Sequence, residues 1–173
     1  GRIFSGEGFG AGEIGHVSVV ENGELCSCGN RGCLETVASV RAMLRQAQAA
    51  ADENPDSLLA KLRPAGGTVS WEILRQACQQ GDETAQKIVS QAGTLLGVAV
   101  ANLVGILNMN RIVIAGNVAQ TGDVFIEAVR LSMNRRVLPK LAEETAVLYT
   151  NTNSNLVLLG ASALILSKGL GVI

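Results

Sequence analysis

An α/β fold with helices packed on a mixed sheet is predicted for this chain by three features of its 173 residues. Aromatic residues make up only 3%, while small and aliphatic residues are plentiful, a balance that suits helices packed closely on a sheet. The β-branched run from Arg111 to Ala115 ends in Gly116-Asn117 and precedes a helical pattern, as buried parallel strands do. Helical patterns outnumber strand patterns, so the sheet is expected to be incomplete.

The amino-terminal third is predicted to be mostly loop. Residues 2–4 resemble the end of a strand, and the glycines of residues 6–15 predict a flexible loop. Their spacing superficially suggests a dinucleotide-binding fingerprint, but no strand-then-helix context surrounds it, so this signal is weak. Residues 16–20 predict a strand that ends in an Asn22-Gly23 turn. An apolar rhythm then predicts a helix from about Leu34.

The rest of the chain alternates helices and strands. Residues 52–69 predict a loop or a short helical excursion, because prolines and glycines interrupt them. Helices are expected over residues 70–80 and 83–108, with Asp82 as the N-cap of the second. Small residues along that second helix indicate close contact with its neighbours. A helix over 123–136, a strand over 146–150 and a final helix over 160–168 complete the pattern.

Charge and hydropathy exclude several classes of function for these residues. The formal net charge is −1 and no basic face dominates, so these residues give no sign of binding nucleic acid. The most apolar stretch, residues 95–107, is shorter than the roughly 20 residues that span a bilayer. No apolar signal segment follows Gly1 to Phe4. We therefore expect a cytoplasmic protein with no membrane partner.

Three of the four cysteines fall within eight positions. Cys26, Cys28 and Cys33 are separated by glycines that let the backbone bring three sulfurs together. Zinc prefers four tetrahedral ligands, and His16, the only histidine, is the expected fourth. Three thiolates and a neutral imidazole form a closed set of about −1 charge, so the predicted zinc ion is structural. Cys78 lies apart, in a helical pattern, and is expected in the core.

Two carboxylates are expected beside this cluster. Glu13 precedes His16 by three positions, and Glu35 follows Cys33 by two. Carboxylates and an imidazole suit sugar hydroxyls, which both donate and accept hydrogen bonds. His16 can serve both purposes, with one ring nitrogen on zinc and the other toward a ligand. The alternatives are a solvated loop charge for Glu13 and, for Glu35, a first-turn acid favoured by the helix dipole.

The run GEIGH at residues 12–16, followed by CSCGNRGCLE at 26–35, resembles the signature of the ROK family of repressors, uncharacterised reading frames and sugar kinases. The resemblance implies an actin-like, ribonuclease-H-like ATPase fold of two lobes with a sugar cleft between them. It also implies that Glu13, His16 and Glu35 hold the sugar, and that His16, Cys26, Cys28 and Cys33 hold zinc. Gly116 and Asn117 match a loop that lies near the nucleotide in kinase members.

The chain resembles only the carboxyl-terminal lobe of such a protein, over residues 1–173. The phosphate loop, the general-base aspartate and the helix-turn-helix expected of family members are not in these residues, which are therefore expected to be a fragment without catalytic residues. The sequence alone favours the sugar-sensing domain of a transcriptional regulator, because residues 115–122 lack the glycine run of kinases. Such a protein would bind a small-molecule sugar, reach DNA only through a missing amino-terminal domain, and form a homodimer.

Two alternatives stay open at this point. An ATP-dependent sugar kinase of the glucokinase or N-acetylhexosamine kinase type would use ATP and Mg²⁺, since Gly116 and Gly122 still permit a nucleotide loop. A zinc-stabilised interaction module would bind no sugar at all. The identity of the sugar is open among glucose, N-acetylglucosamine, N-acetylmannosamine and xylose.

Overall fold

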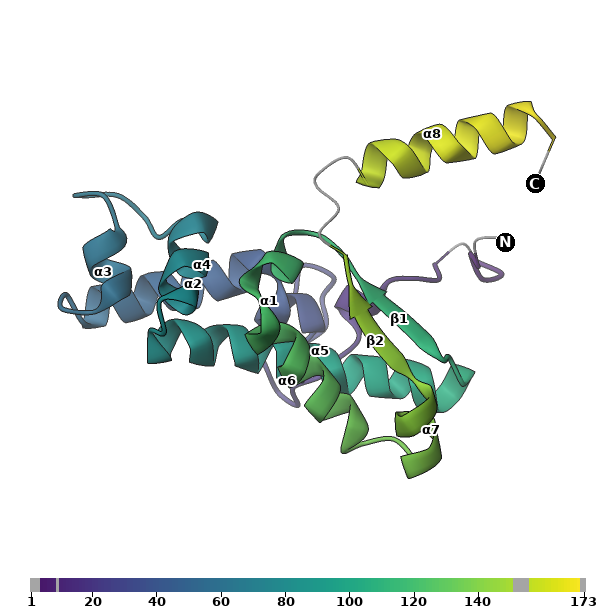
Figure 1. Cartoon of the computed structure of the whole chain (residues 1–173), viewed down its shortest axis with the longest axis horizontal. Helices are drawn as coiled ribbons and strands as arrows, with labels where there is room; N and C mark the ends of the chain where they lie inside the picture. Colours follow the sequence, from purple (N-terminus) through teal and green to yellow (C-terminus); the bar gives the residue numbers. More distant parts are fainter. Residues whose placement is uncertain (1–3, 9, 151–155, 172–173) are drawn as a thin grey trace.

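The structure, a computed structural model, describes residues 4–8, 10–150 and 156–171 (Figure 1). A loop region with the short 3₁₀ helix η1 (Ile14–His16) comes first, and helices α1 (Leu34–Ala38) and α2 (Val40–Glu53) follow it. Helices α3 (Leu58–Leu62), α4 (Trp71–Gln79) and α5 (Glu83–Leu107) come next. Strand β1 (Arg111–Ile114), the 3₁₀ helix η2 (Asn117–Thr121), α6 (Asp123–Asn134), α7 (Pro139–Glu144), β2 (Ala146–Tyr149) and α8 (Leu156–Gly169) complete the order.

Side-chain caps fix where several of these helices begin. The hydroxyls of Ser39, Ser57 and Ser70 accept hydrogen bonds from the backbone N–H three residues later, at the starts of α2, α3 and α4. Asp82 accepts from the N–H of Ala85, which confirms the predicted cap of α5. Each cap satisfies an N–H that has no partner within the helix. For residues 52–69 the sequence predicted either a loop or a short helical excursion, and the structure has the short helix α3 there, over residues 58–62.

Helix α5 packs against α6, and two glycines of α5 allow the close approach. A Cβ on Gly93 would lie 2.5 Å from the carbonyl oxygen of Phe125, and one on Gly97 would lie 2.5 Å from the Cβ of Ser132. The Ser132 hydroxyl donates to the Thr94 carbonyl, 2.6 Å away, across the same contact. The close contact predicted from the small residues of α5 is therefore confirmed.

Strands β1 and β2 form a parallel pair, with Arg111 opposite Ala146 and Ile114 opposite Tyr149. Arg130 of α6 donates two hydrogen bonds to the carbonyl oxygen of Val147, so α6 is tied to the sheet. The prediction of a fully buried strand is wrong, because Val113 is 57% exposed while Ile114 is buried. Only one face of this pair is covered by the described residues.

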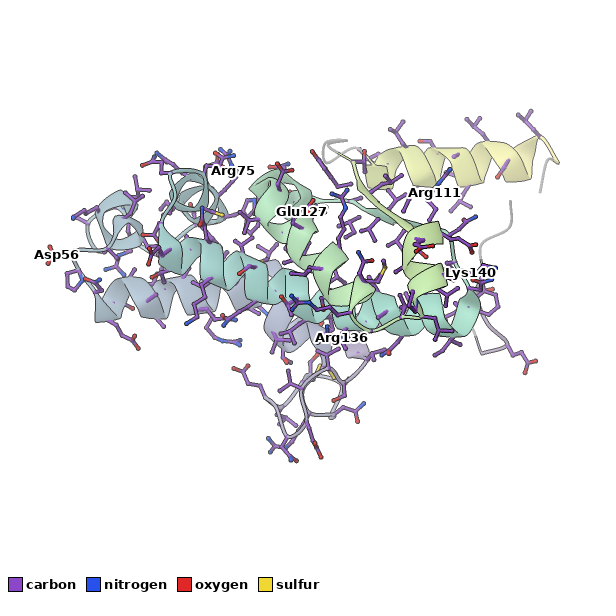
Figure 2. All side chains as sticks on the ribbon, turned by 60° about the horizontal axis from the view of Figure 1, so that its bottom comes forward. Asp56, Arg75, Arg111, Glu127, Arg136 and Lys140 are labelled. Atoms are coloured by element: carbon purple, nitrogen blue, oxygen red, sulfur yellow. The ribbon has the colours of Figure 1, made fainter. Side chains whose placement is uncertain are left out.

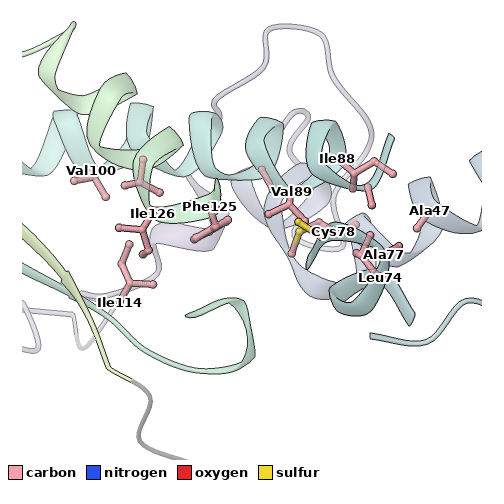
Figure 3. Close-up of a cluster of buried hydrophobic side chains, with 14 of the residues drawn as sticks. Ala47, Leu74, Ala77, Cys78, Ile88, Val89, Val100, Ile114, Phe125 and Ile126 are labelled. Atoms are coloured by element: carbon pink, nitrogen blue, oxygen red, sulfur yellow. The ribbon is translucent and has the colours of Figure 1, made fainter. Parts of the chain in front are cut away.

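The core is built mainly from helices. Figure 3 shows Phe125 and Ile126 of α6, Val89 and Val100 of α5, and Ile114 of β1 in one apolar cluster. Cys78 is 2% exposed within the same cluster, which confirms its predicted core position. Charged side chains lie outside it, and those labelled in Figure 2 carry both signs and are spread along the molecule.

Other expectations need correction. Residues 16–20 do not form a strand: His16 ends η1, and Ser18 makes an isolated antiparallel bridge to Cys33. The backbone there turns to bring His16 toward the cysteines instead of extending. In the described residues the sheet is one parallel pair, and antiparallel pairing is limited to isolated bridges, so a mixed sheet is not seen there. The predicted strand end at residues 2–4 lies mostly outside the described residues.

Helix α5, with 25 residues, is long and apolar enough to cross a membrane. The stretch considered from the sequence, residues 95–107, forms only the last part of this helix, so the length of the apolar segment was underestimated there. Half of its most apolar stretch is nevertheless buried inside the structure, as in the core helix of a globular protein.

Helix α8 is not packed in this way. Figure 1 shows it apart from the other helices, and its large apolar side chains, such as Leu158 and Ile165, are exposed.

Candidate metal and ligand site

Glycines shape the loop that carries the cysteines. Gly32 has a φ of +69°, and a Cβ there would lie 1.7 Å from the carbonyl oxygen of Val20, so no other residue fits. The Gly32 carbonyl accepts from the N–H groups of Val19 and Val20, and its own N–H donates to Glu24. The predicted turn is present, with Asn22 at a positive φ. The loop therefore folds back on the segment that follows His16.

This folding brings together four side chains that could bind a metal ion, which we call the metal-type cluster. One ligand atom from each of His16, Cys26, Cys28 and Cys33 lies within 4.8 Å of the others. His16 Nδ1 is 3.6 Å from Cys26 Sγ, and the Sγ atoms of Cys28 and Cys33 are also 3.6 Å apart. Sulfur ligands on one tetrahedral zinc ion lie about 3.8 Å apart. The predicted ligands thus lie together, and the two 3.6 Å spacings are close to those expected around one zinc ion.

The environments of the donors differ. Cys33 is fully buried, and this burial raises the pKa of its thiol to about 12. Cys28 is exposed, and a hydrogen bond from the backbone of Asn30 lowers the pKa of its thiol. The hydrogen bond with Cys26 raises the pKa of His16, and the nearby carboxylates of Glu35 and Glu13 add to this. A metal cation would compete with these protons for the same atoms.

The two predicted carboxylates have different neighbours in the candidate site. Nε2 of His16 is 3.8 Å from a carboxylate oxygen of Glu13, while Nδ1 faces Cys26. Glu35, in the first turn of α1, accepts hydrogen bonds from Cys26 Sγ at 3.3 Å and from Ser27 Oγ at 3.2 Å. These bonds lower the pKa of Glu35, so its carboxyl is ionised near neutral pH. Glu13 is 72% exposed and free to turn toward a ligand.

Residues Gly116 and Asn117 lie where the chain leaves β1. Gly116 has a φ of +96°, which favours glycine, and Asn117 begins η2. An apolar pocket of about 210 Å³ is lined by Val118 of η2 and by Gly15 and Glu35, among others. The η2 helix that follows this loop therefore shares a pocket with the candidate site.

One site residue, Ser27, was missed by sequence reasoning. It lies between two predicted metal ligands, yet only the fold of the loop brings its hydroxyl to Glu35, eight positions later. A serine between two cysteines carries no pattern that predicts this contact.

The α/β fold, with carboxylates beside a candidate metal cluster, fits the actin-like ATPase class, and the relatives of the chain imply the same fold. The chain belongs to the ROK family, whose model matches residues 1–168. It is 36% identical over 144 residues to a glucokinase of Halalkalibacterium halodurans, covering 83% of this chain and 44% of that protein. It is 31% identical to the DNA-binding transcriptional repressor Mlc of Escherichia coli, covering 87% of this chain and 36% of the repressor.

Similar solved structures also include both a sugar kinase and a transcriptional regulator. A ROK glucokinase from Streptomyces griseus in complex with glucose and AMPPNP superposes with a TM-score of 0.77 at 28% identity, covering 89% of this chain and 51% of the kinase. A ROK transcriptional regulator homologous to the Escherichia coli Mlc protein superposes with a TM-score of 0.73 at 30% identity, covering 80% of this chain and 34% of the regulator. The chain thus spans about half or less of the length of these relatives, and they do not separate regulator from kinase.

Proposed function

We propose that residues 1–173 are the carboxyl-terminal, sugar-binding lobe of a cytoplasmic ROK-family transcriptional regulator, built around a structural zinc ion. The observation that carries this proposal is the position of His16. One of its ring nitrogens faces the cysteine cluster, while the other faces Glu13. A single side chain thus connects a metal-type cluster to a carboxylate suited to sugar hydroxyls.

The donor set supports zinc in particular. His16, Cys26, Cys28 and Cys33 would hold the ion, and a set of one imidazole and three thiolates is typical of closed, structural zinc sites. When bound, such an ion supplies folding free energy and leaves no open position for a water nucleophile. The ion would fix the loop and, through it, the positions of Glu13 and Glu35.

The chain's own residues would then bind the sugar by hydrogen bonds. The carboxylates of Glu13 and Glu35 accept from ligand hydroxyls, and Nε2 of His16, which would carry the ring proton when Nδ1 holds the metal, donates. The second lobe of the cleft would come from the half of the family's length that lies outside this chain. Sugar contacts to both lobes would shift their arrangement, which is what a sensor requires. DNA would be contacted by a separate amino-terminal domain, in a homodimer.

A regulator is favoured over a kinase by the loop after β1. Residues 115–122 carry only two glycines, Gly116 and Gly122, and a sensor does not need a loop that holds nucleotide phosphates. Phosphoryl transfer depends on positioning and charge around Mg²⁺ and nucleotide, and no residue of this chain is proposed to be catalytic.

The second candidate is an ATP-dependent sugar kinase of the glucokinase or N-acetylhexosamine kinase type. It is favoured by one observation, the apolar pocket between Glu35 and Val118, next to Gly116 and Asn117. Concave apolar pockets beside a few polar groups are typical small-molecule sites. ATP and Mg²⁺ would then bind the full-length protein near this loop.

Sugar binding by the full-length protein tests the shared part of both candidates. Isothermal titration should show that Glu35→Ala weakens binding of the preferred sugar at least about tenfold, because hydrogen bonds to a charged group are among the stronger ones. The zinc content should stay at one per chain. Glu83→Ala is the matched control, since Glu83 is also a first-turn helix acid but lies in α5. Unchanged affinity in Glu35→Ala would remove Glu35 from the site.

Two further assays on the same protein separate the candidates. A regulator should release its DNA when the sugar is added and should not consume ATP. A kinase should convert the sugar and ATP to a sugar phosphate and ADP.

A further inference from the structure

Ser27 contacts a carboxylate that the proposed site uses. Its Oγ donates to Oε1 of Glu35 at 3.2 Å, and the Cys26 thiol donates to the same oxygen at 3.3 Å. Ser27 Oγ also lies 3.9 Å from Cys26 Sγ. Among the described residues, these two neighbours supply the side-chain hydrogen bonds to Glu35.

The two donors have different surroundings. Cys26 belongs to the candidate metal cluster, and its Sγ also lies 3.6 Å from Nδ1 of His16. Ser27 is not a member of that cluster. Its hydroxyl is therefore the hydrogen-bond donor to Glu35 that has no candidate role in binding a metal.

We propose that Ser27 is a positioning residue, which holds the Glu35 carboxylate in place for the sugar. This inference rests on the proposed sugar-binding function of Glu35. The hydroxyl of Ser27 fixes Oε1, so Oε2 is left to accept from a sugar hydroxyl. Without Ser27, the carboxylate would lose one of its two side-chain hydrogen bonds, and sugar binding would cost more of the entropy of ordering it.

A structural role in the loop is the competing explanation, and a second serine tests it. Ser18 Oγ donates to the Arg31 carbonyl at 3.0 Å, so it stiffens the same loop without contacting Glu35. Ser18 and Ser27 are both exposed. Loss of either hydroxyl removes one hydrogen bond from the loop, but only the loss of Ser27 frees the carboxylate.

The experiment titrates the zinc-loaded full-length protein with glucose and with N-acetylglucosamine. Ser27→Ala should raise the Kd of the bound sugar about threefold to tenfold, with zinc content and melting temperature unchanged. Ser27→Thr, which keeps the hydroxyl, should restore the Kd to within about twofold of the wild type. Ser18→Ala should leave the Kd unchanged.

Two results would overturn the role of Ser27: a wild-type Kd in Ser27→Ala, or an equal loss of affinity in Ser18→Ala. Both are distinct from failure of the proposed function. If the wild-type protein bound neither these sugars nor the other candidates, N-acetylmannosamine and xylose, the sugar-binding function and the positioning role would fall together.

Discussion

The four clustered donors are held by different means, so each contributes differently to the site. Cys33 is fully buried at the start of α1, and its Sγ lies 3.5 Å from the His16 carbonyl. Cys28, by contrast, is exposed, and it contributes no buried side chain to the core. The contribution of Cys28 to stability should therefore come almost entirely from its bond to the metal.

Substitution of Cys28 tests this at the scale of one residue. Cys28→Ser should bind little or no zinc and should melt at least about 5 °C below the wild type, because metal binding is coupled to folding of the loop. Zinc analysis and thermal unfolding measure both effects. Cys78→Ala serves as the control, since Cys78 lies in the core of α4 and its loss should leave the zinc content at one. A metal-free Cys28→Ser protein that melted like the wild type would contradict a structural role for zinc.

Residue types predicted which metal-binding side chains would lie together, but not the contacts that each of them makes. Soft ligands at close spacing predicted the cluster, because only the glycines between them were needed to let the sulfurs converge. The side chain of Glu35 shows why the rest was out of reach. Its partners depend on the path of the loop between Gly23 and Gly32, where backbone hydrogen bonds decide which side chains meet. The strand predicted over residues 16–20 failed for the same reason.

At the scale of elements, helices were more predictable than strands. The cap at Asp82 and the apolar period of α5 are local signals, so its bounds were predicted to within one residue. The exposure of a strand residue is not determined by local sequence. Val113 is an apolar residue of the type found in buried strands, but its exposure depends on whether elements distant in sequence pack over it. Helix α8 was predicted approximately, and its apolar composition gave no sign of where it would lie.

The α5–α6 contact can be tested with two glycines on the same helix. Gly97→Ala should destabilise the lobe by about 1–3 kcal/mol, because the new methyl would overlap Ser132 and the Val129 carbonyl. Gly105→Ala is the matched control: nothing lies within 4 Å of a Cβ there, so helix propensity should stabilise α5 by about 0.5–1 kcal/mol. Urea unfolding measures both. If the two substitutions changed stability in the same direction, the close approach of the helices would be wrong.

The whole molecule divides into two parts that are stabilised differently. The core cluster joins helices α2 to α6 and strands β1 and β2, and it contains no residue of the cysteine loop. Residues 17–33, in contrast, have only isolated bridges and turns as regular structure. Their order should depend on the metal, whereas the order of the helices depends on apolar burial.

Removal of the metal should therefore affect the two parts unequally. After treatment with a chelator, amide hydrogen exchange should become fast across residues 17–33, while amides of α5 and α6 stay protected. Far-UV circular dichroism should change little at 20 °C, because the helices keep their core. Zinc, but not magnesium, should restore protection, since three thiolates favour the softer ion. If α5 lost protection together with the loop, the metal would instead hold the entire lobe together, and the cluster and the core would be one cooperative unit.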